Sequence, residues 1–270
     1  MFPDAFKIAK VIPLYKSNDI TITSNYRPIS LLSTFSKILE KIVKDQLTKY
    51  VNESKVLCEN QFGFRKSKNI TDALFLLTRD FNEAIIKNKR SMVVFLDLAK
   101  AFDTVDRTKL LRKLQLLGVK ENAYKWFESY FENRVQMTTI NGINSKLKTV
   151  DFGVIQGSTL GPLLFLIYIN NLAKVYIGGK LYMFADDTAI FFQADSWEEV
   201  FELAPRNLTL IKKWFDQNLL TLNITKTKFL PLSLRDNVDT DVNSIKFHSC
   251  GDSINYTCNC DSIERVNEYK

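Results

Sequence analysis

Two adjacent acids, Asp186 and Asp187, stand between two short, strongly apolar stretches of this 270-residue chain. The flanking stretches, 180–185 and 188–193, have the length and composition of buried strands, so the pair predicts a hairpin turn. Two carboxylates at such a turn repel each other and lose hydration beside apolar strands. A divalent cation would relieve both costs, because Mg²⁺ binds carboxylate and phosphate oxygens. An ordinary Asp-Asp turn that faces water is the competing interpretation.

A third acid, Asp97, ends another apolar strand, which is predicted at 91–98. Two strand ends far apart in sequence can meet in one sheet, and this would place three carboxylates together. Three carboxylates that hold two metal ions suit in-line phosphoryl or nucleotidyl transfer. Asp103 and Asp106 follow closely, and we interpret them as a loop residue and a helix cap.

The residue composition excludes several kinds of catalysis. The single histidine, His248, rules out Ser-His-Asp and Cys-His hydrolases and His-ligated zinc enzymes over most of the chain. Neither a G-x-x-x-x-G-K-[ST] loop nor a G-x-G-x-x-G motif is present. Chemistry has to come from carboxylates, Lys, Arg, Tyr or a metal. Three late cysteines near His248 match no common zinc-finger spacing, and we interpret them as small apolar strand residues: Cys250, Cys258 and Cys260.

The charge is unevenly distributed along the chain, whose net charge is +7. Residues 1–150 hold 26 basic and 15 acidic side chains, whereas residues 151–270 hold 11 and 15. A basic first half suits a polyanion such as nucleic acid, although a merely solvated basic surface has the same composition. No apolar run is long enough to span a membrane and the start lacks a signal-peptide pattern, so neither membrane anchoring nor secretion is expected.

The spacing of apolar residues predicts an α+β fold, with helices and strands that do not alternate regularly. Residues 2–25 are expected to be irregular because Pro3 and Pro13 interrupt them. A turn at 141–142 predicts a hairpin, and Asn69, Asp106 and Ser196 are predicted helix N-caps. The helices are predicted at 29–50, 69–87, 107–117, 124–131, 162–172 and 196–219. The strands are predicted at 91–98, 135–140, 146–152 and on both sides of 186–187.

Two kinds of loop are candidates for contacts with phosphates. The glycine-rich loop 156–162 leads into a helix and presents backbone N–H groups, although a plain strand-to-helix connection has the same pattern. Basic residues in polar loops of the first half can clamp a triphosphate or a nucleic-acid backbone, although most single basic residues are solvated surface. These residues are Arg27, Arg65, Lys66 and Lys68.

Five ordered motifs make the chain resemble reverse transcriptases, in particular those of non-LTR retrotransposons of the jockey-like, long-interspersed-element type. The motifs are 25–32 (NYRPISLL), 61–65 (QFGFR), 95–103 (FLDLAKAFD), 156–162 (QGSTLGP) and 184–187 (FADD). The resemblance implies a right-hand polymerase with fingers over about residues 1–90. The palm, over 91–270 with finger insertions, would be an antiparallel sheet with packed helices. It also implies a fragment or truncated copy that ends before the primer grip, without thumb or endonuclease domain.

The resemblance also implies roles for the acids. Asp97, Asp186 and Asp187 match the catalytic residues that bind two Mg²⁺ ions, with Mn²⁺ as a possible substitute. Phe102 matches the bulky residue that excludes a ribose 2′-OH and so favours dNTPs. Lys226 matches a residue that is proposed to protonate the pyrophosphate leaving group.

Further residues match the nucleotide-binding parts of the family. Gln156 and Gly157 match the loop that lies against the incoming nucleotide and the template. Arg65 and Lys68 match basic finger residues that face the triphosphate. From the charge pattern alone, Arg27 and Lys66 are expected to contact nucleic acid.

The implied activity is RNA-directed DNA polymerisation, in which dNTPs are added to a DNA primer on an RNA template, in the nucleus or cytoplasm. An RNA-dependent RNA polymerase or maturase-like relative is disfavoured by Ala185 and Phe102, since viral RNA polymerases usually have Gly at the former position and no aromatic at the latter. An inactive nucleic-acid-binding remnant is favoured by the truncation and opposed by the three intact acids. A two-carboxylate glycosidase ranks last, because it needs two opposed acids rather than an adjacent pair.

Overall fold

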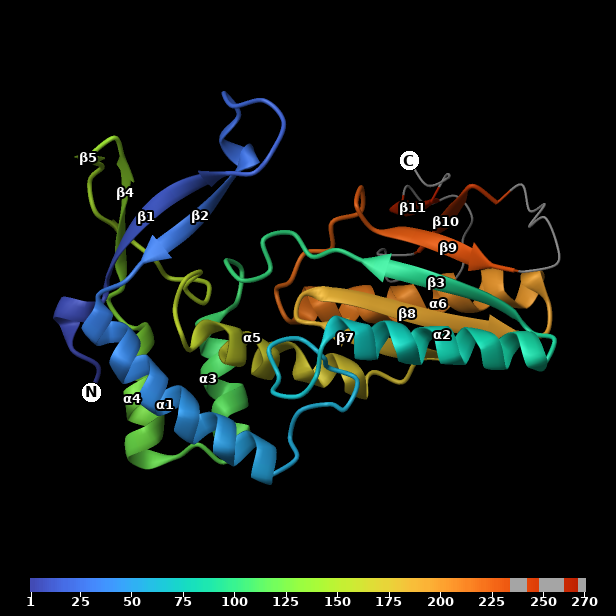
Figure 1. Cartoon of the computed structure of the whole chain (residues 1–270), viewed down its shortest axis with the longest axis horizontal. Coiled ribbons are helices and arrows are strands. Elements are labelled where there is room, and N and C mark those ends of the chain that lie inside the picture. The colour runs from blue at the N-terminus through green and yellow to red at the C-terminus, as the bar shows by residue number, and fades with distance from the viewer. Residues whose placement is uncertain (234–241, 248–259, 267–270) are drawn as a thin grey trace. The chain divides into compact units, whose positions relative to one another are not determined.

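The computed structural model describes residues 1–233, 242–247 and 260–266, which form helices and sheets as the α+β prediction requires (Figure 1). The chain divides into two compact units whose segments interleave along the sequence. Unit 1 contains Met1–Leu57 and Phe102–Ile169, and unit 2 contains Cys58–Ala101 and Asn170–Lys270. Each unit has its own sheet. Within the described ranges, every helix is too short or too polar to cross a membrane.

Unit 1 is built on a sheet with the order β2-β1-β4-β5, and β6 also pairs with β4. β1 runs antiparallel to β2 and parallel to β4. The prediction that residues 2–25 are irregular is wrong for Ile8–Tyr15, which form β1. Its alternation of buried Ala9 and Val11 with exposed Lys10 was obscured by Pro13, which pairs with Pro28 of β2. The strands of this unit are β1 Ile8–Tyr15, β2 Tyr26–Leu31, β4 Val135–Ile140, β5 Ile143–Asn144 and β6 Lys148–Thr149.

The helices of unit 1 follow the predicted order. The first begins at Thr34 rather than at 29, because residues 26–31 pair with β1 as a strand. α3 packs on both α4 and α5, and α5 is buried from Leu163 to Ile169. These helices are α1 Thr34–Glu53, α3 Arg107–Leu116, α4 Glu121–Phe131 and α5 Gly161–Ile169, with short 3₁₀ turns η1 Asp4–Phe6 and η2 Thr23–Asn25.

Two local predictions in unit 1 are confirmed. The Asp106 carboxylate accepts a hydrogen bond from Lys109 N at 2.6 Å, so it caps α3, and Gly118 with φ +99° follows the end of that helix. Asn141 and Gly142 both have positive φ, as the tightest two-residue hairpin turns require, and they connect β4 to β5. Both features depend only on neighbouring residues.

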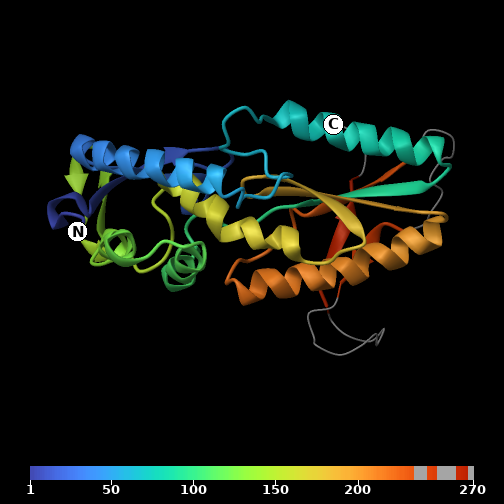
Figure 2. The ribbon, with the colours of Figure 1, turned by 90° about the horizontal axis from the view of Figure 1, so that it is seen from below.

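Unit 2 contains a six-stranded sheet with the order β10-β11-β9-β3-β8-β7. Neighbouring strands in this sheet are antiparallel, except that β11 runs parallel to β9. The expected antiparallel sheet is therefore present with one parallel pair. α2 and α6 cover opposite faces of this sheet (Figure 2). The elements are α2 Ile70–Ile86, β3 Arg90–Leu96, η3 Asn170–Lys174, β7 Gly179–Phe184, β8 Asp187–Ala194, α6 Trp197–Gln217, β9 Lys228–Leu232, β10 Ser244–Lys246 and β11 Ser262–Arg265.

The core of unit 2 explains why acids gather at the end of its sheet. Val93 and Phe191, a registered pair of β3 and β8, are buried together with Ala84 of α2. Met92 and Val94 alternate to the other face of β3 and are also fully buried. Because α2 and α6 cover both faces, a charge inside β3 would lose its hydration without compensation. Charged side chains therefore occur only at the ends of this strand.

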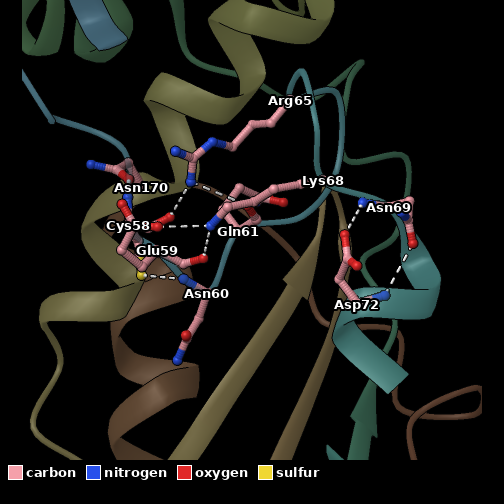
Figure 3. A network of polar contacts seen from close by, with 9 residues as sticks. All are labelled: Cys58, Glu59, Asn60, Gln61, Arg65, Lys68, Asn69, Asp72 and Asn170. Carbon is pink, nitrogen blue, oxygen red and sulfur yellow. Dashed lines mark hydrogen bonds and ion pairs between the residues drawn. The ribbon is translucent and has the colours of Figure 1, made fainter. Parts of the chain in front are cut away.

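The predicted cap of α2 is present as a reciprocal capping box (Figure 3). Asp72 N donates to Asn69 Oδ1 at 3.0 Å, and Asn69 N donates to Asp72 Oδ2 at 2.9 Å. The predicted cap of α6 is present too, since Ser196 Oγ accepts from Glu199 N at 3.2 Å. Each side chain satisfies a backbone donor that has no partner inside its helix.

We expect Asn69→Ala to lower the free energy of unfolding by about 1 kcal/mol, because the cap of α2 is lost. Asn69→Ser should retain most of that stability, since a serine hydroxyl also accepts from the backbone. Urea denaturation followed by circular dichroism measures both variants. Equal losses from the two substitutions would contradict a contribution from the cap.

Candidate active site

Three acids, Asp97, Asp186 and Asp187, lie at one end of the sheet of unit 2. β3 and β8 are antiparallel, and their last registered pair at this end joins Leu96 to Thr188. Asp97 follows Leu96 and Asp187 precedes Thr188, so the next position along each strand is acidic. The pairing of β3 with β8 thus brings together acids that are 90 positions apart in the chain.

The tight turn between β7 and β8 presents the other acid. Ala185 and Asp186 form this two-residue turn, and Phe184 pairs with Asp187 to close it. Ala185 has φ +59°, in the left-handed region that L side chains rarely adopt. A positive φ at the first turn position matches the twist of the paired strands, and glycine is the usual residue there. An alanine in this conformation is a local strain at the site.

The backbone of Asp97 is tied to the segment 221–227, which precedes β9. Asp97 N donates to Thr227 Oγ1 at 3.3 Å, and Asp97 O accepts from Asn223 N at 2.8 Å. Lys226, the predicted general acid, lies in this segment and is exposed. Unit 2 therefore places the segment of Lys226 beside the end of β3, next to the first acid.

Burial and like charge both make the acids of the turn harder to ionise. Burial, and then the charge of Asp97, raises the pKa of Asp186, while a hydrogen bond to its own backbone opposes the rise. Burial, followed by the charges of Asp186 and Asp97, raises the pKa of Asp187. Because both changes disfavour the charged form, a cation at this end of the sheet would be bound favourably.

The donor set fits a hard divalent cation, since carboxylate oxygens are the ligands that Mg²⁺ and Mn²⁺ take. In the part of the chain that the structure describes, no basic side chain forms an ion pair with Asp97, Asp186 or Asp187. Across those same residues, no three His, Cys, Asp or Glu side chains are already gathered to hold a metal. Cys260 is described, whereas His248, Cys250 and Cys258 lie outside the described residues.

The predicted nucleotide-contacting loop lies in unit 1, where β2 supports it. Ser30 N donates to Gln156 O at 2.8 Å, and a Cβ at Gly157 would lie 2.3 Å from Ser30 O. Only glycine fits at position 157, where φ is +108°. Gln156 Nε2 donates to Asp103 Oδ1 at 3.0 Å. Asp103, expected to be an ordinary loop residue, therefore orients the amide of Gln156.

A buried carboxylate that the sequence analysis did not single out holds the end of this loop. Glu40 Oε2 accepts from Thr159 N at 2.7 Å and from Leu160 N at 3.3 Å, just before α5 begins. Tyr130 OH donates to the other oxygen, Oε1, at 3.2 Å. Glu40 is fully buried on the face of α1 that also carries Leu47. The sequence signal that could have identified Glu40 is an acidic residue on the helix face that also carries apolar residues, since acids are seldom buried without a partner.

Phe102 is anchored in unit 1 by a neighbouring ring. Its ring stacks on Phe165 of α5, with 4.5 Å between the ring centroids and 17° between the planes. Its carbonyl accepts a hydrogen bond from Val154 N at 2.8 Å. The side chain is half-buried, so one part of the ring packs and another part stays accessible.

The two basic residues that were predicted to face a triphosphate brace their own loop in unit 2 (Figure 3). Arg65 Nη1 donates to Cys58 O at 2.7 Å and to Gln61 O at 3.3 Å. Lys68 Nζ lies 2.9 Å from a carboxylate oxygen of Glu59 and also contacts the Glu59 carbonyl. The other two predicted nucleic-acid contacts are exposed: Arg27 on β2 of unit 1 and Lys66 in the loop of unit 2.

The sequence pattern of the family described as "Reverse transcriptase (RNA-dependent DNA polymerase)" matches residues 14–249. The chain belongs to this reverse transcriptase family. The match includes all three acids of the sheet end, together with the five motifs on which the resemblance was based. Reverse transcriptases use divalent metal ions, in agreement with the donor chemistry of the three carboxylates.

Mobile-element polymerases are similar to this chain over most of its length. The probable RNA-directed DNA polymerase from transposon BS of Drosophila melanogaster is 30% identical over 84% of this chain and 26% of its own length. The RNA-directed DNA polymerase from mobile element jockey of the same organism is 28% identical over 83% of this chain and 25% of its own length. The chain thus spans about a quarter of these curated relatives. The predicted non-LTR retrotransposon type is confirmed.

Solved telomerase structures share the fold of this chain. The apo telomerase from Candida tropicalis has a TM-score of 0.61 at 12% identity, over 92% of this chain and 48% of its own. A telomerase from Candida albicans, solved in complex with a TWJ fragment of telomeric RNA, has a TM-score of 0.60 at 13% identity, over 91% of this chain and 44% of its own. The predicted polymerase fold of fingers and palm is confirmed.

We expect Asp186→Asn to raise the melting temperature of this chain near neutral pH in EDTA. The raised pKa of Asp186 means that its ionised form opposes folding above that pKa, so the gain should fade as the pH drops toward 3.8, the ordinary value for aspartate. The same substitution should reduce the further stabilisation that excess MgCl₂ gives to the unaltered chain. Thermal unfolding with EDTA and with MgCl₂ measures both effects.

Asp45→Asn, on the exposed side of α1, is the matched control and should melt like the unaltered chain in both buffers. An Asp186→Asn protein that gains as much from MgCl₂ as the control would contradict the assignment of Asp186 as a metal ligand.

Proposed function

We propose that this chain is the catalytic core of an RNA-directed DNA polymerase of a non-LTR retrotransposon, which adds dNTPs to a primer 3′-OH by two-metal nucleotidyl transfer. The observation that carries the proposal is the end of the unit 2 sheet, where Asp97, Asp186 and Asp187 occupy neighbouring strand and turn positions without a basic partner among the described residues. A divalent cation that is bound by one or two carboxylates keeps coordination positions open for substrate phosphates. The three carboxylates offer this kind of binding to two such ions.

Asp97, Asp186 and Asp187 would hold two Mg²⁺ ions, for which Mn²⁺ is a possible substitute. When bound, such ions supply Lewis-acid activation of the primer hydroxyl and stabilise charge on the transferred and departing phosphates. The chain's part is to fix the three carboxylates by strand register and to keep them ionised once the cations offset their repulsion. Lys226, exposed in the segment tied to Asp97, would donate the proton that the pyrophosphate leaving group takes up.

The nucleotide would be selected by residues of unit 1. The anchored ring of Phe102 would exclude a ribose 2′-OH, because its stack on Phe165 prevents it from moving aside. Gln156 and Gly157 would lie against the incoming nucleotide and the template base. Asp103 orients the side-chain amide of Gln156 for this contact. The close approach of Gly157 to β2 leaves the loop backbone little freedom, which favours one geometry of the bound nucleotide.

Basic side chains would neutralise the phosphates of the substrates. Arg65 and Lys68 now bind carbonyl and carboxylate oxygens of their own loop, so a triphosphate would compete with those acceptors for charge-assisted hydrogen bonds. Arg27 and Lys66, both exposed, would contact the backbone of the RNA template or DNA primer. Base pairing with the template, rather than protein contacts, would then specify the added base.

We extend the proposal to the domain plan. Residues 1–90 would supply the fingers and residues 91–270 the palm with finger insertions. The two compact units interleave along the sequence, so each of them draws on both of these ranges. The relatives named above carry the name RNA-directed DNA polymerase, and the matched region covers 26% and 25% of their lengths.

Primer extension on an RNA template with dNTPs and Mg²⁺ tests the proposal. We expect extension by the unaltered chain and by Asp45→Asn, and a loss of at least roughly 100-fold in Asp186→Asn, because one metal ligand is removed. Extension that persists in Asp186→Asn would contradict the assignment of the site. A folded chain that binds RNA in a salt-dependent manner without any extension would instead support the nucleic-acid-binding remnant.

We expect Phe102→Val to reduce the preference for dNTPs over rNTPs by roughly 10- to 100-fold, since the smaller side chain leaves room for the 2′-OH. Phe102→Tyr keeps the ring and should keep the preference. Single-nucleotide addition with each substrate gives kcat/KM for the three proteins. If both variants discriminate like the unaltered chain, Phe102 serves only the packing against Phe165.

A further inference from the structure

A buried amide, Gln61, binds the turn that carries the catalytic acids. Its side-chain oxygen Oε1 accepts from Ala185 N at 3.0 Å and from Gly63 N at 2.9 Å. Gln61 is 1% exposed and Ala185 is 3% exposed, so water does not reach either partner of this bond. Because Ala185 immediately precedes Asp186, the bond acts on the backbone that orients the metal-binding carboxylate.

The segment around Gln61 is registered on β7 like a further short strand. Phe62 N donates to Met183 O and Met183 N donates to Asn60 O, each at 2.8 Å, which gives a parallel bridge between Gln61 and Met183. Figure 3 shows Gln61 beside the carbonyl and guanidinium groups of the same loop. The amide therefore approaches the turn from a fixed backbone and not from a free loop.

The contact leaves no room for a larger residue at position 63. A Cβ built on Gly63 would lie 2.4 Å from Ala185 N and 2.9 Å from the carbonyl carbon of Phe184. The backbone of the loop is thus packed against the backbone of the turn, and a side chain at Gly63 would push the two apart.

The turn needs such a partner for two reasons. Ala185 is held at φ +59°, a conformation that an alanine leaves readily unless its surroundings enforce it. Its buried N–H also has to find an acceptor, because an unpaired buried donor is costly. Gln61 meets both needs with a neutral oxygen, whereas a carboxylate would add a fourth negative charge near Asp186 and Asp187.

One further observation separates this role from simple packing. Gln61 Nε2 is buried and has no hydrogen-bond partner in the ranges that the structure describes. A residue kept only for stability would be better apolar, because a buried unpaired donor is destabilising. The oxygen of the amide is the part that the turn uses.

We propose that Gln61 is a positioning residue, whose amide oxygen locks the turn at Ala185 so that Asp186 and Asp187 bind metal in catalytic geometry. This inference rests on the proposed function, because it assigns Gln61 a role in the polymerase reaction. The residue touches neither substrate nor metal and acts only through the backbone of the turn.

The test compares Gln61→Met, which keeps length and burial but removes the acceptor, with Gln61→Glu, which keeps an acceptor. Asn60→Ala is the matched control, because Asn60 bonds Met183 through its backbone carbonyl alone. We expect Gln61→Met to lower kcat by about 100-fold with the KM for dNTP unchanged, since misplaced ligands affect the chemical step. Gln61→Glu should recover at least about a tenth of the lost rate, and Asn60→Ala should behave like the unaltered chain.

Amide hydrogen exchange supplies a readout that does not depend on activity. In Gln61→Met, exchange should quicken in a peptide that covers 183–190 and stay unchanged in α6. The increase in melting temperature on addition of MgCl₂ should shrink as well, because the ligands are less well placed.

The possible results distinguish a failure of the positioning role of Gln61 from a failure of the proposed polymerase function. Faster local exchange with an unchanged kcat, or an Asn60→Ala protein as slow as Gln61→Met, would overturn the positioning role. If the unaltered chain itself does not extend a primer, the polymerase proposal fails, and the MgCl₂-induced stabilisation then decides whether Gln61 positions the metal ligands. Equal stabilisation of Gln61→Met and the unaltered chain would overturn the inference in that case too.

Discussion

Repulsion among three carboxylates is the constraint that the sheet of unit 2 has to withstand. The acids meet because β3 and β8 are paired so that Leu96 lies opposite Thr188. Side chains alternate along a strand, so a slip of one residue would send the acid of one strand to the other face. With α2 and α6 covering both faces, such a slip would also misplace every core residue of the strand. The packing of the core therefore fixes the distance between the charges.

The motifs that resemble the family meet in pairs through backbone contacts. In unit 2, residues 60–63 lie against the turn at Ala185, and in unit 1, Ser30 lies against Gln156 and Gly157. Each pair includes a glycine where a Cβ would collide with the partner backbone. The remaining motif, 95–103, has Asp97 in unit 2 and Asp103 in unit 1. Within each pair, segments far apart in sequence are held together by a close backbone approach that only a glycine permits.

Local signals were predicted well from the sequence, and long-range contacts were not. The caps at Asn69 and Asp106 are formed with residues three positions away, so the local sequence is enough to predict them. β1 was missed because Pro13 resembles a breaker, and only its pairing with β2 and β4 makes it a strand. The three acids were found because charge between apolar strands is conspicuous. The bond from Ala185 to Gln61 joins residues 124 positions apart, and no periodicity or composition indicates it.

Several energetic costs occur together at the end of the unit 2 sheet that carries the acids. The pKa values of Asp186 and Asp187 are raised, Ala185 holds a left-handed conformation and Gln61 carries an unpaired buried donor. The helices that cover this sheet have satisfied N-caps, and the central strand β3 is buried on both faces. Several independent costs at a single point are not expected of a sheet selected for stability alone. The raised pKa values in particular are expected of carboxylates that bind a cation, because a positive charge offsets their mutual repulsion.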